Sequence, residues 1–525
     1  MTKGCLDFHN VVFYYESAGS PVFDGLSVQI PSGWTGVIGP NGSGKTTLLR
    51  LACGELAPVR GGIRSPDRVI YCPQRTDDPP GEVESFLGAT DRSACVLRGQ
   101  LAIEADWATR WATLSHGERK RVQIAVALWL KPRVLAVDEP TNHIDLDARR
   151  LLARALATFR GIGLLVSHDR DLLDAICGQC LFVEPPGAVM RPGGYTKATE
   201  LAKAEQAQAR RARSEARREL KRLEREAADR AREAARSHRQ RSKRGLDPKD
   251  HDARGRINLA RLTGKDGQAG RLLRQMDGRL DQAQDKLEGI HAKKQQRMGI
   301  TMNGARSRRD ALLRLPGGSI ALGHERRLGF PELWISPQDR IALIGPNGGG
   351  KSTLVRHIVG RLALPKDKLV YLAQEIDRSE ATRVIAAVRR LSKKMLAEVL
   401  STVSRLGSDP ERVMETAEPS PGELRKIMLA LGMAHTPHLI VMDEPTNHLD
   451  LASIECLESA LASCRPGLLL VSHDLRFLRH LTRTRWEISP DPDDATATQM
   501  LLRTRPWPGA PDPDREDSDP PPPPT

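Results

Sequence analysis

The chain has 525 residues, a formal net charge of +14, 39% hydrophobic residues and only 4% aromatic residues. This length allows several domains of about 100–200 residues each. No run of about 18 apolar residues occurs, which excludes a transmembrane helix, and the first residues (MTKGCLDFHN) lack a secretory pattern, so we expect a cytoplasmic protein. Eight cysteines are scattered. We interpret Cys177 and Cys180 as lying on a helix, because no second pair or histidine cluster completes a zinc site.

Four sequence landmarks occur twice, each pair separated by 305 or 306 positions. The pairs are GPNGSGKTT (39–47) and GPNGGGKST (345–353), LSHGE (114–118) and PSPGE (419–423), VLAVDEPTNHID (134–145) and LIVMDEPTNHLD (439–450), and LLVSHD (164–169 and 469–474). Constant spacing indicates two copies of one domain. We place the copies at residues 1–195 and 317–490.

In each copy a glycine-rich loop lies between a short apolar strand and a helical pattern. This context supports a phosphate cradle, in which backbone N–H groups and a helix N-terminus face the anion. Lys45 and Lys351 are expected to reach the β- and γ-phosphates, and the hydroxyls of Thr46 and Ser352 to bind Mg²⁺. The nucleotide-binding loop residues are Gly39, Pro40, Asn41, Gly42, Ser43, Gly44, Lys45, Thr46 and Thr47, then Gly345, Pro346, Asn347, Gly348, Gly349, Gly350, Lys351, Ser352 and Thr353.

Polar residues follow three further apolar strands in each copy. We expect a glutamine to join metal and water, an aspartate to hold Mg²⁺, a glutamate to polarise or deprotonate the attacking water, and a histidine to contact the γ-phosphate. In the two copies these residues are Gln74 and Gln374, Asp138 and Asp443, Glu139 and Glu444, and His168 and His473.

The order of phosphate loop, glutamine, LSxGE-type signature, DEPT and switch histidine resembles the ATP-binding cassette superfamily. The resemblance implies an α/β fold of two P-loop cassettes that close around two ATP molecules, each signature capping the nucleotide of the other cassette. Since both copies keep a glutamate after the aspartate, both are expected to hydrolyse ATP. The capping residues implied are Ser115 and Gly117 for ATP at Lys351, and Ser420 and Gly422 for ATP at Lys45.

Two positions depart from the pattern of that superfamily. The second signature begins with Pro419, where leucine is usual, but proline is tolerated ahead of a helix. Members of the superfamily often stack an aromatic residue on adenine, and Tyr15 is placed for this role in the first copy. Residues 318–329 (GSIALGHERRLG) contain no aromatic residue, so we expect the second site to hold the base less firmly.

Both copies read TNH after DEPT, at residues 141–143 and 446–448. This spelling resembles the soluble F subfamily, whose members act on ribosomes. The resemblance implies a linker that approaches the P-site tRNA and the peptidyl-transferase centre. The intervals from glutamine to signature serine are 41 and 46 residues, so the extra arm of some members is lacking, as in the antibiotic-resistance members. A role in tuning or rescuing translation is the alternative.

The linker between the copies, residues 196–316, carries the basic charge of the chain. Residues 201–310 contain 31 Lys and Arg against 16 Asp and Glu, whereas the rest of the chain contains 49 against 50. Such a local excess is typical of a segment that binds a polyanion, and we expect ribosomal RNA as the partner. A coiled-coil spacer with a solvated surface is the alternative.

Two helical patterns, at 201–240 and 271–296, predict a helical hairpin with its tip at about 241–270. In the first, opposite charges recur at helical spacing: Glu215–Arg218, Glu219–Arg222 and Glu226–Arg230. The first pattern alone would span about 60 Å. Basic residues in the tip are candidates for RNA contact. They are Arg254, Arg256 and Arg261.

The last segment, 491–525, is rich in proline and acidic residues and is predicted to be disordered. We expect the protein to be a monomer, because the resemblance implies that its two cassettes pair with each other within one chain. Two other functions remain open: the ATPase subunit of a membrane transporter, and an ATPase of DNA maintenance. For the second of these functions a basic domain is expected after the second cassette, and this sequence shows none.

Overall fold

The computed structural model describes residues 5–16, 19–142, 144–240, 265–290, 307–323, 326–374, 376–408, 410, 419–447, 449–492, 494 and 498–508. It divides into two compact units. One unit consists of Met1–Ala198 and Gln296–Thr525 and contains both repeats, and the other is Thr199–Gln295.

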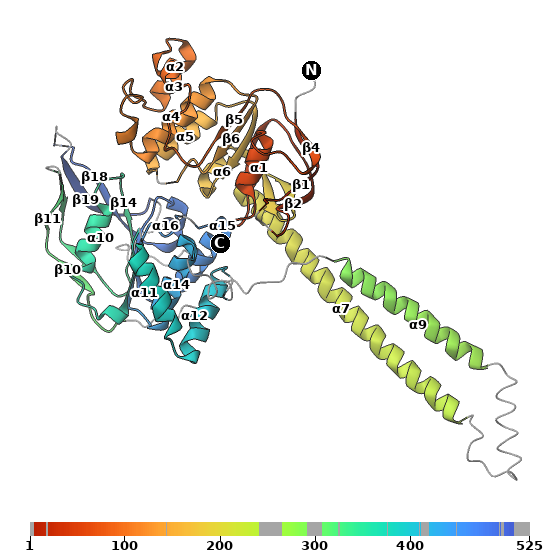
Figure 1. Ribbon diagram of the computed structural model, residues 1–525. Helices are drawn as coiled ribbons and strands as arrows, with labels where there is room; N and C mark the ends of the chain where they lie inside the picture. The colour runs from red at the N-terminus through yellow and green to blue at the C-terminus, as the bar shows by residue number, and fades with distance from the viewer. Residues whose placement is uncertain are drawn as a thin grey trace, which may run out of the picture. The chain divides into compact units, whose positions relative to one another are not determined.

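The first repeat is an α/β domain with a mainly parallel sheet (Figure 1). Its elements are β1 (Leu6–Phe13), β2 (Phe23–Ile30), β3 (Gly33–Ile38), α1 (Lys45–Ala52), β4 (Arg60–Arg64), β5 (Val69–Cys72), α2 (Val83–Gly88), α3 (Arg92–Gln100), α4 (His116–Trp129), β6 (Val134–Asp138), α5 (Leu146–Leu156), β7 (Ile162–Val166), α6 (Arg170–Ile176), β8 (Cys177–Glu184) and β9 (Gly187–Pro192). The main sheet has the order β5-β6-β7-β3-β8-β9, parallel as far as β8, and a smaller antiparallel sheet has the order β2-β1-β4.

The second repeat has the same arrangement of parallel strands. Its elements are β10 (Leu313–Leu315), β11 (Gly318–Gly323), β12 (Arg326–Phe330), β13 (Leu333–Ile335), β14 (Arg340–Ile344), α10 (Lys351–Val359), β15 (Leu369–Leu372), α11 (Arg378–Arg389), α12 (Lys393–Arg405), α14 (Pro421–Ala434), β16 (Leu439–Asp443), α15 (Leu451–Ala462), β17 (Gly467–Val471), α16 (Leu475–Leu481), β18 (Thr484–Pro490) and β19 (Gln499–Pro506). Its main sheet has the order β11-β12-β19-β18-β14-β17-β16-β15. The predicted pair of α/β repeats is confirmed.

The central strands of both sheets are apolar apart from the aspartates that end β6 and β16. Every residue of β6, β7, β16 and β17 is buried. Parallel strands covered on both faces need such continuous apolar runs. Polar residues therefore gather where these strands end, which is the usual place for a ligand site in an open parallel sheet.

The C-terminal boundary predicted for the second repeat is wrong. Residues 499–506 form β19, which pairs antiparallel with β18 and parallel with β12. Met500, Leu502 and Trp507 are buried, and the Trp507 indole N–H donates to Thr482 Oγ1 at 2.9 Å. The acidic and proline-rich connection before β19 hid this short strand. Residues 509–525 lie outside the described part of the chain.

Two further boundaries differ from the prediction. β10 pairs with β13 and buries Leu313 and Leu315, so the second repeat begins before residue 317. Cys177 and Cys180 lie on β8 and not on a helix. Both thiols are buried, which raises the pKa of Cys180 to about 12 and leaves it protonated.

The linker contains α7 (Tyr195–Gln240) and α9 (Lys265–Glu288), two helices that run side by side in Figure 1. Ala216 and Leu223 of α7 and Met276 of α9 are buried. The ion pair predicted between Glu219 and Arg222 forms at 2.6 Å. α9 begins at Lys265 and not at residue 271, and the candidate tip arginines lie outside the described residues. In the part of the chain that the structure describes, no helix is long and apolar enough to cross a membrane.

Candidate active sites

Each repeat contains a cavity at the carboxyl ends of its parallel strands. The first has a volume of about 520 Å³ and the second about 430 Å³. The predicted residues that line the first are Tyr15, Asn41, Gly42, Gly44, Lys45, Thr46, Thr47, Gln74, Asp138, Glu139 and His168. Those that line the second are Asn347, Gly348, Gly350, Lys351, Ser352, Thr353, Gln374, Asp443, Glu444 and His473. Segments far apart in the sequence thus meet in one site.

The two loop lysines have the same hydrogen bonds. Lys45 Nζ donates to the carbonyls of Gly39 and Pro40 at 2.9 and 3.0 Å. Lys351 Nζ donates to the corresponding carbonyls of its own loop at the same distances. Burial lowers the pKa of both ammonium groups, while the acidic residues nearby raise it. Each cavity therefore presents a fixed ammonium group to an anion.

Glycine is required where each loop enters its helix. Gly44 and Gly350 have φ of 92° and 95°, in the left-handed region that other residues rarely adopt. A Cβ atom at Gly44 would lie 2.5 Å from Val22 Cγ1, and one at Gly350 would lie 2.6 Å from a Leu322 methyl carbon. These glycines let the backbone N–H groups of the helix N-terminus face the cavity.

Oxygen ligands suited to Mg²⁺ lie beside the loops. Thr46 Oγ1 donates to Asp138 Oδ2 at 2.7 Å, and Ser352 Oγ lies 3.4 Å from Gln374 Oε1. Asp443 Oδ1 is buried and has no hydrogen-bond partner in the described residues. Since no group of three His, Cys, Asp or Glu residues in the described chain is arranged to hold a metal ion by itself, Mg²⁺ here would need phosphate and water oxygens to complete its shell.

Glu139, which is buried, and His168, which is half-buried, form a pair in the first cavity. The His168 backbone N–H donates to Glu139 Oε2 at 3.2 Å, and His168 Nε2 lies 3.1 Å from Glu139 Oε1. Burial raises the pKa of Glu139 to about 8, assisted by Asp138 and opposed by Lys45. Burial, with Lys45, lowers the pKa of His168 to about 4, so this imidazole is neutral at pH 7. A glutamate with a pKa near neutrality suits a general base.

Glu444 and His473 form the corresponding pair in the second cavity. The His473 backbone N–H donates to Glu444 Oε2 at 3.4 Å. Burial raises the pKa of Glu444 to about 7, against the charges of Lys351 and Arg149. His473 Nε2 lies 3.0 Å from Asn347 Oδ1 and 3.4 Å from Lys351 Nζ. Both glutamates have positive φ, 45° and 50°, a conformation held by the turn after each strand.

Comparison with known proteins identifies the family. The family profile described as ABC transporter matches residues 23–142 and 331–447. The ATP-binding protein Uup of Caulobacter vibrioides is 30% identical over 494 residues, covering 88% of this chain and 74% of Uup. The ribosome protection protein VmlR of Bacillus subtilis is 26% identical over 492 residues, covering 90% and 85%. Both relatives are F-subfamily proteins. The chain belongs to the F subfamily of ATP-binding cassette proteins.

The fold of the chain agrees with that of a solved structure. The crystal structure of the archaeal ribosome recycling factor aABCE1 with the stalk protein aP1 has a TM-score of 0.58 and 18% sequence identity to this chain. The similarity covers 94% of this chain and 89% of that chain. The two repeats are therefore called the first and second cassettes below.

The signature residues begin helices but do not line either cavity of this F-subfamily protein. Ser115 caps α4 in a capping box with Glu118, and Ser420 caps α14 in the same way with Glu423. Gly117 and Gly422 lie in the first turns of these helices. Pro421 occupies the first turn of α14, where the missing backbone N–H of proline removes no hydrogen bond of the helix. The capping of ATP by the opposite cassette stays a prediction.

The two cavities differ in their aromatic lining, as the sequences of the two copies do. Tyr15 lines the first cavity, where its hydroxyl lies 2.9 Å from Thr47 Oγ1 and its ring packs edge-on against Phe13. In the second cavity Leu322 takes part in the lining. Among the described lining residues, a tyrosine ring is therefore available to a base in the first cavity and not in the second.

Several residues of these cavities were not predicted from the sequence. Asn142 and Asn447 line the two cavities, although the TNH motif that contains them was visible. The Tyr71 hydroxyl donates to Asp138 Oδ2 at 3.2 Å. Arg149 of the first cassette lines the second cavity. No motif marks it, because it lies within a helix and its site belongs to the other cassette.

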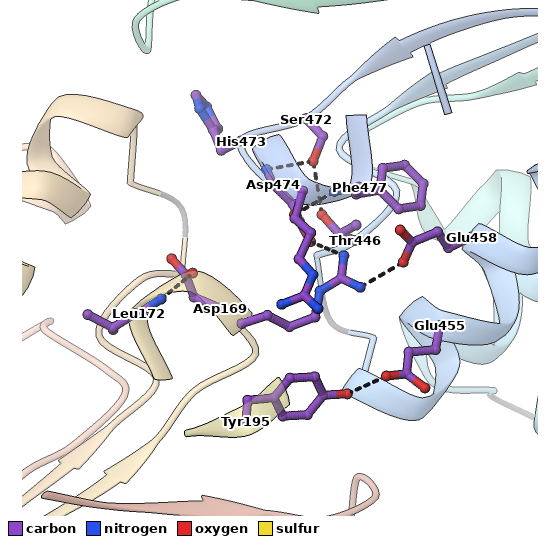
Figure 2. Close-up of polar contacts among 12 residues, drawn as sticks. Asp169, Leu172, Tyr195, Thr446, Glu455, Glu458, Ser472, His473, Asp474 and Phe477 are labelled. Carbon is purple, nitrogen blue, oxygen red and sulfur yellow. Dashed lines mark hydrogen bonds and ion pairs between the residues drawn. The ribbon is translucent and has the colours of Figure 1, made fainter. Parts of the chain in front are cut away.

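Polar contacts join the two cassettes beside the cavities (Figure 2). The Asn41 backbone N–H donates to Asp450 Oδ2 at 3.0 Å. Arg170, which has only 4% of its surface exposed, binds Glu458 at 2.7 Å and Asp474 at 3.2 Å. Figure 2 also shows the Tyr195 hydroxyl pointing to Glu455, at 2.7 Å. The loops after β7 and β17 therefore lie at the interface between cassettes.

Proposed function

We propose that this protein is an ATP hydrolase that binds the ribosome in its ATP-bound, closed state. Its basic hairpin would act near the P-site tRNA and the peptidyl-transferase centre, and would protect the ribosome against antibiotics. The observation that carries the proposal is the presence, on one chain, of two cavities that each contain a loop lysine, an aspartate, a glutamate and a histidine, and of one helical unit with a large basic excess.

In the proposed reaction Glu139 or Glu444 accepts a proton from a water molecule as the water oxygen attacks the γ-phosphorus. The bond between that phosphorus and the β–γ bridging oxygen breaks, which gives ADP and phosphate. Bound Mg²⁺ would neutralise charge on the phosphate oxygens. The loop lysine adds a fixed positive charge, and the neutral switch histidine orients the glutamate through the contacts described above.

The ribosome is the proposed target for two reasons. The excess of Lys and Arg lies in the segment that contains α7 and α9, and a basic rod is suited to a phosphate-lined cavity. In addition, the relative VmlR is named as a ribosome protection protein. Because each phosphate contact releases counterions, ribosome binding should weaken steeply as salt is raised.

A double Glu139→Gln, Glu444→Gln variant tests the proposal. It should bind ATP without hydrolysing it, and it should co-sediment with ribosomes in ATP more fully than the wild type does. Equal co-sedimentation of the two proteins would contradict an ATP-gated ribosome factor. Equal competition by duplex DNA would favour DNA maintenance, and recovery in a membrane complex would favour a transporter subunit.

A charge-matched pair of variants tests the hairpin tip. Alanine at Arg254, Arg256 and Arg261 should preserve ATP hydrolysis by the isolated protein and abolish its effect on the ribosome. The control carries alanine at three exposed arginines of α7, which removes the same charge elsewhere. These are Arg211, Arg213 and Arg217. An equal loss of ribosomal effect in both variants would indicate a solvated spacer and not an active tip.

The drug-protection part of the proposal has its own test. Expression of the wild type in a susceptible strain should raise the inhibitory concentration of at least one ribosome-targeting antibiotic, and the double glutamine variant should not. If no antibiotic is affected while translation rates still respond to the protein, its role is to tune or rescue translation.

A further inference from the structure

The second cavity contains a positively charged side chain that comes from the first cassette. Arg149, in α5, lines this cavity together with Lys351 and Glu444. Its Nη1 donates to the His473 carbonyl at 3.0 Å and lies 3.4 Å from Asp169 Oδ2. The Arg149 Nε–H is buried and has no hydrogen-bond partner in the described residues. This donor of the guanidinium group therefore has no protein acceptor, although the side chain lines the cavity.

Among the described residues that line the first cavity, none is an equivalent of this arginine. Arg149 stands four residues after Asp145, the N-cap of α5, and the same position after Asp450 is Ile454. Ile454 has 1% of its surface exposed and packs in the core of the second cassette. The two N-cap aspartates are thus common to both sites, whereas the cation occurs in one.

The charges near each site agree with this difference. The charge of Asp145 raises the pKa of Lys351 in the second site, and the charge of Asp450 raises the pKa of Lys45 in the first. Arg149 acts on Glu444, where it offsets part of the increase in pKa that burial causes. It also helps burial and Lys351 to lower the pKa of His473. The guanidinium group therefore lies close enough to influence the groups proposed for hydrolysis.

We propose that Arg149 of the first cassette binds the phosphate chain of ATP in the second cassette's site. Guanidinium groups bind phosphate oxygens in a planar, two-pronged manner that lysine does not reproduce. In phosphoryl transfer an added arginine stabilises the charge of the transition state. The first cassette's site lacks this contribution, so the two sites are unequal. This inference rests on the proposed ATP hydrolysis and is independent of the ribosomal target.

A purely mechanical role makes a different prediction. An Arg149 that only held the loop of His473 against Asp169 would support the cassette interface, on which both sites depend. Its removal would then weaken both sites. An Arg149 that binds ATP affects the second site alone.

Single-site backgrounds separate these roles. Glu139→Gln leaves hydrolysis to the second site, and Glu444→Gln leaves it to the first. Adding Arg149→Ala to the Glu139→Gln protein should lower ATP hydrolysis by about 10-fold or more, given the size of arginine effects in related reactions. Adding it to the Glu444→Gln protein should change hydrolysis less than about 2-fold. Arg149→Lys should restore only part of the loss, because lysine binds phosphate as a point charge.

A binding measurement gives a readout besides hydrolysis. Photolabelling with 8-azido-ATP, followed by assignment of the labelled peptides, reports occupancy of each cassette. Arg149→Ala should raise the ATP-analogue concentration for half-labelling of the second cassette by about 10-fold and leave the first unchanged. Arg150→Ala is the control, since Arg150 is exposed and pairs with the equally exposed Asp147, at 3.3 Å. That variant should match its parent.

Equal losses in both backgrounds, or no loss in either, would overturn the proposal. If neither parent hydrolysed ATP, the proposed ATPase function would fail, and the labelling experiment would still decide the role of Arg149. Selective weakening of the second cassette's label would support the proposal even then. Equal labelling of wild type and Arg149→Ala would refute it.

Discussion

Glu444 should destabilise the nucleotide-free protein at neutral pH, and Glu444→Gln should remove this cost. The side chain has 4% of its surface exposed, and burial raises its pKa from 4.5 to about 7. Between these two pH values the folded state holds a proton that the unfolded state has released. The free energy of unfolding therefore falls as pH rises through this window and is lowest above pH 7.

The size of the effect follows from the pKa values. Each pKa unit is equivalent to about 1.4 kcal/mol, so the cost of Glu444 reaches about 3 kcal/mol above pH 7. The glutamine variant lacks this titration. It should equal the wild type near pH 4.5 and exceed it by up to about 3 kcal/mol at pH 8. For a domain of this size, that corresponds to a rise of about 6–12 °C in Tm of the second cassette.

Calorimetry of the nucleotide-free protein between pH 5 and pH 8 measures this difference. Glu332→Gln, which changes an exposed residue of the same cassette, is the control, and its Tm should follow that of the wild type across this pH range. A Tm difference between Glu444→Gln and wild type that stayed constant from pH 5 to pH 8 would refute the reasoning. So would a lower Tm of the variant at pH 8, because burial would then not be the main influence on this carboxyl group.

Other changes have equally definite expected results. Gly350→Ala should abolish nucleotide labelling of the second cassette, since the added Cβ meets a side chain at 2.6 Å in a left-handed backbone; unchanged labelling would contradict this. Thr46→Ala should lower Mg²⁺-dependent hydrolysis in the Glu444→Gln background by about 10-fold or more, measured as phosphate release. Trp507→Ala should lower the free energy of unfolding of the second cassette by about 3–5 kcal/mol in denaturant titration, as for other buried tryptophans. Tyr195→Phe should weaken the contact between the two cassettes by about 1–3 kcal/mol, because the hydrogen bond from the Tyr195 hydroxyl to Glu455 is lost.

The cavities could be predicted from the sequence because each of their main parts is a contiguous motif. A glycine-rich loop, an aspartate followed by glutamate, and a histidine after an apolar strand each specify a short piece of backbone. The parallel sheet then brings these pieces together, since the carboxyl ends of β3, β6 and β7 share one edge. Local sequence and global fold agree at these positions.

The parts that could not be predicted depend on pairing between distant segments. β19 follows an acidic, proline-rich connection, and its burial of Met500 arises only from insertion between β12 and β18. Arg149 reads as one more charged residue on a helix. Its place in the second cavity results from the packing of one cassette against the other, which no single motif encodes.

The interface between cassettes also reaches the beginning of the basic helix. Tyr195 is the first residue of α7, and its hydroxyl donates to Glu455 of α15, the helix that begins just after Asp450. Arg476, three residues after His473, donates to Thr196 Oγ1 at 3.0 Å and pairs with Asp174 at 3.1 Å. The two segments that hold the start of α7 are thus the same two that contribute Asp450 and His473 to the nucleotide sites. A rearrangement of these loops when ATP binds or is hydrolysed would therefore act directly on the first turn of α7, without an intermediate domain.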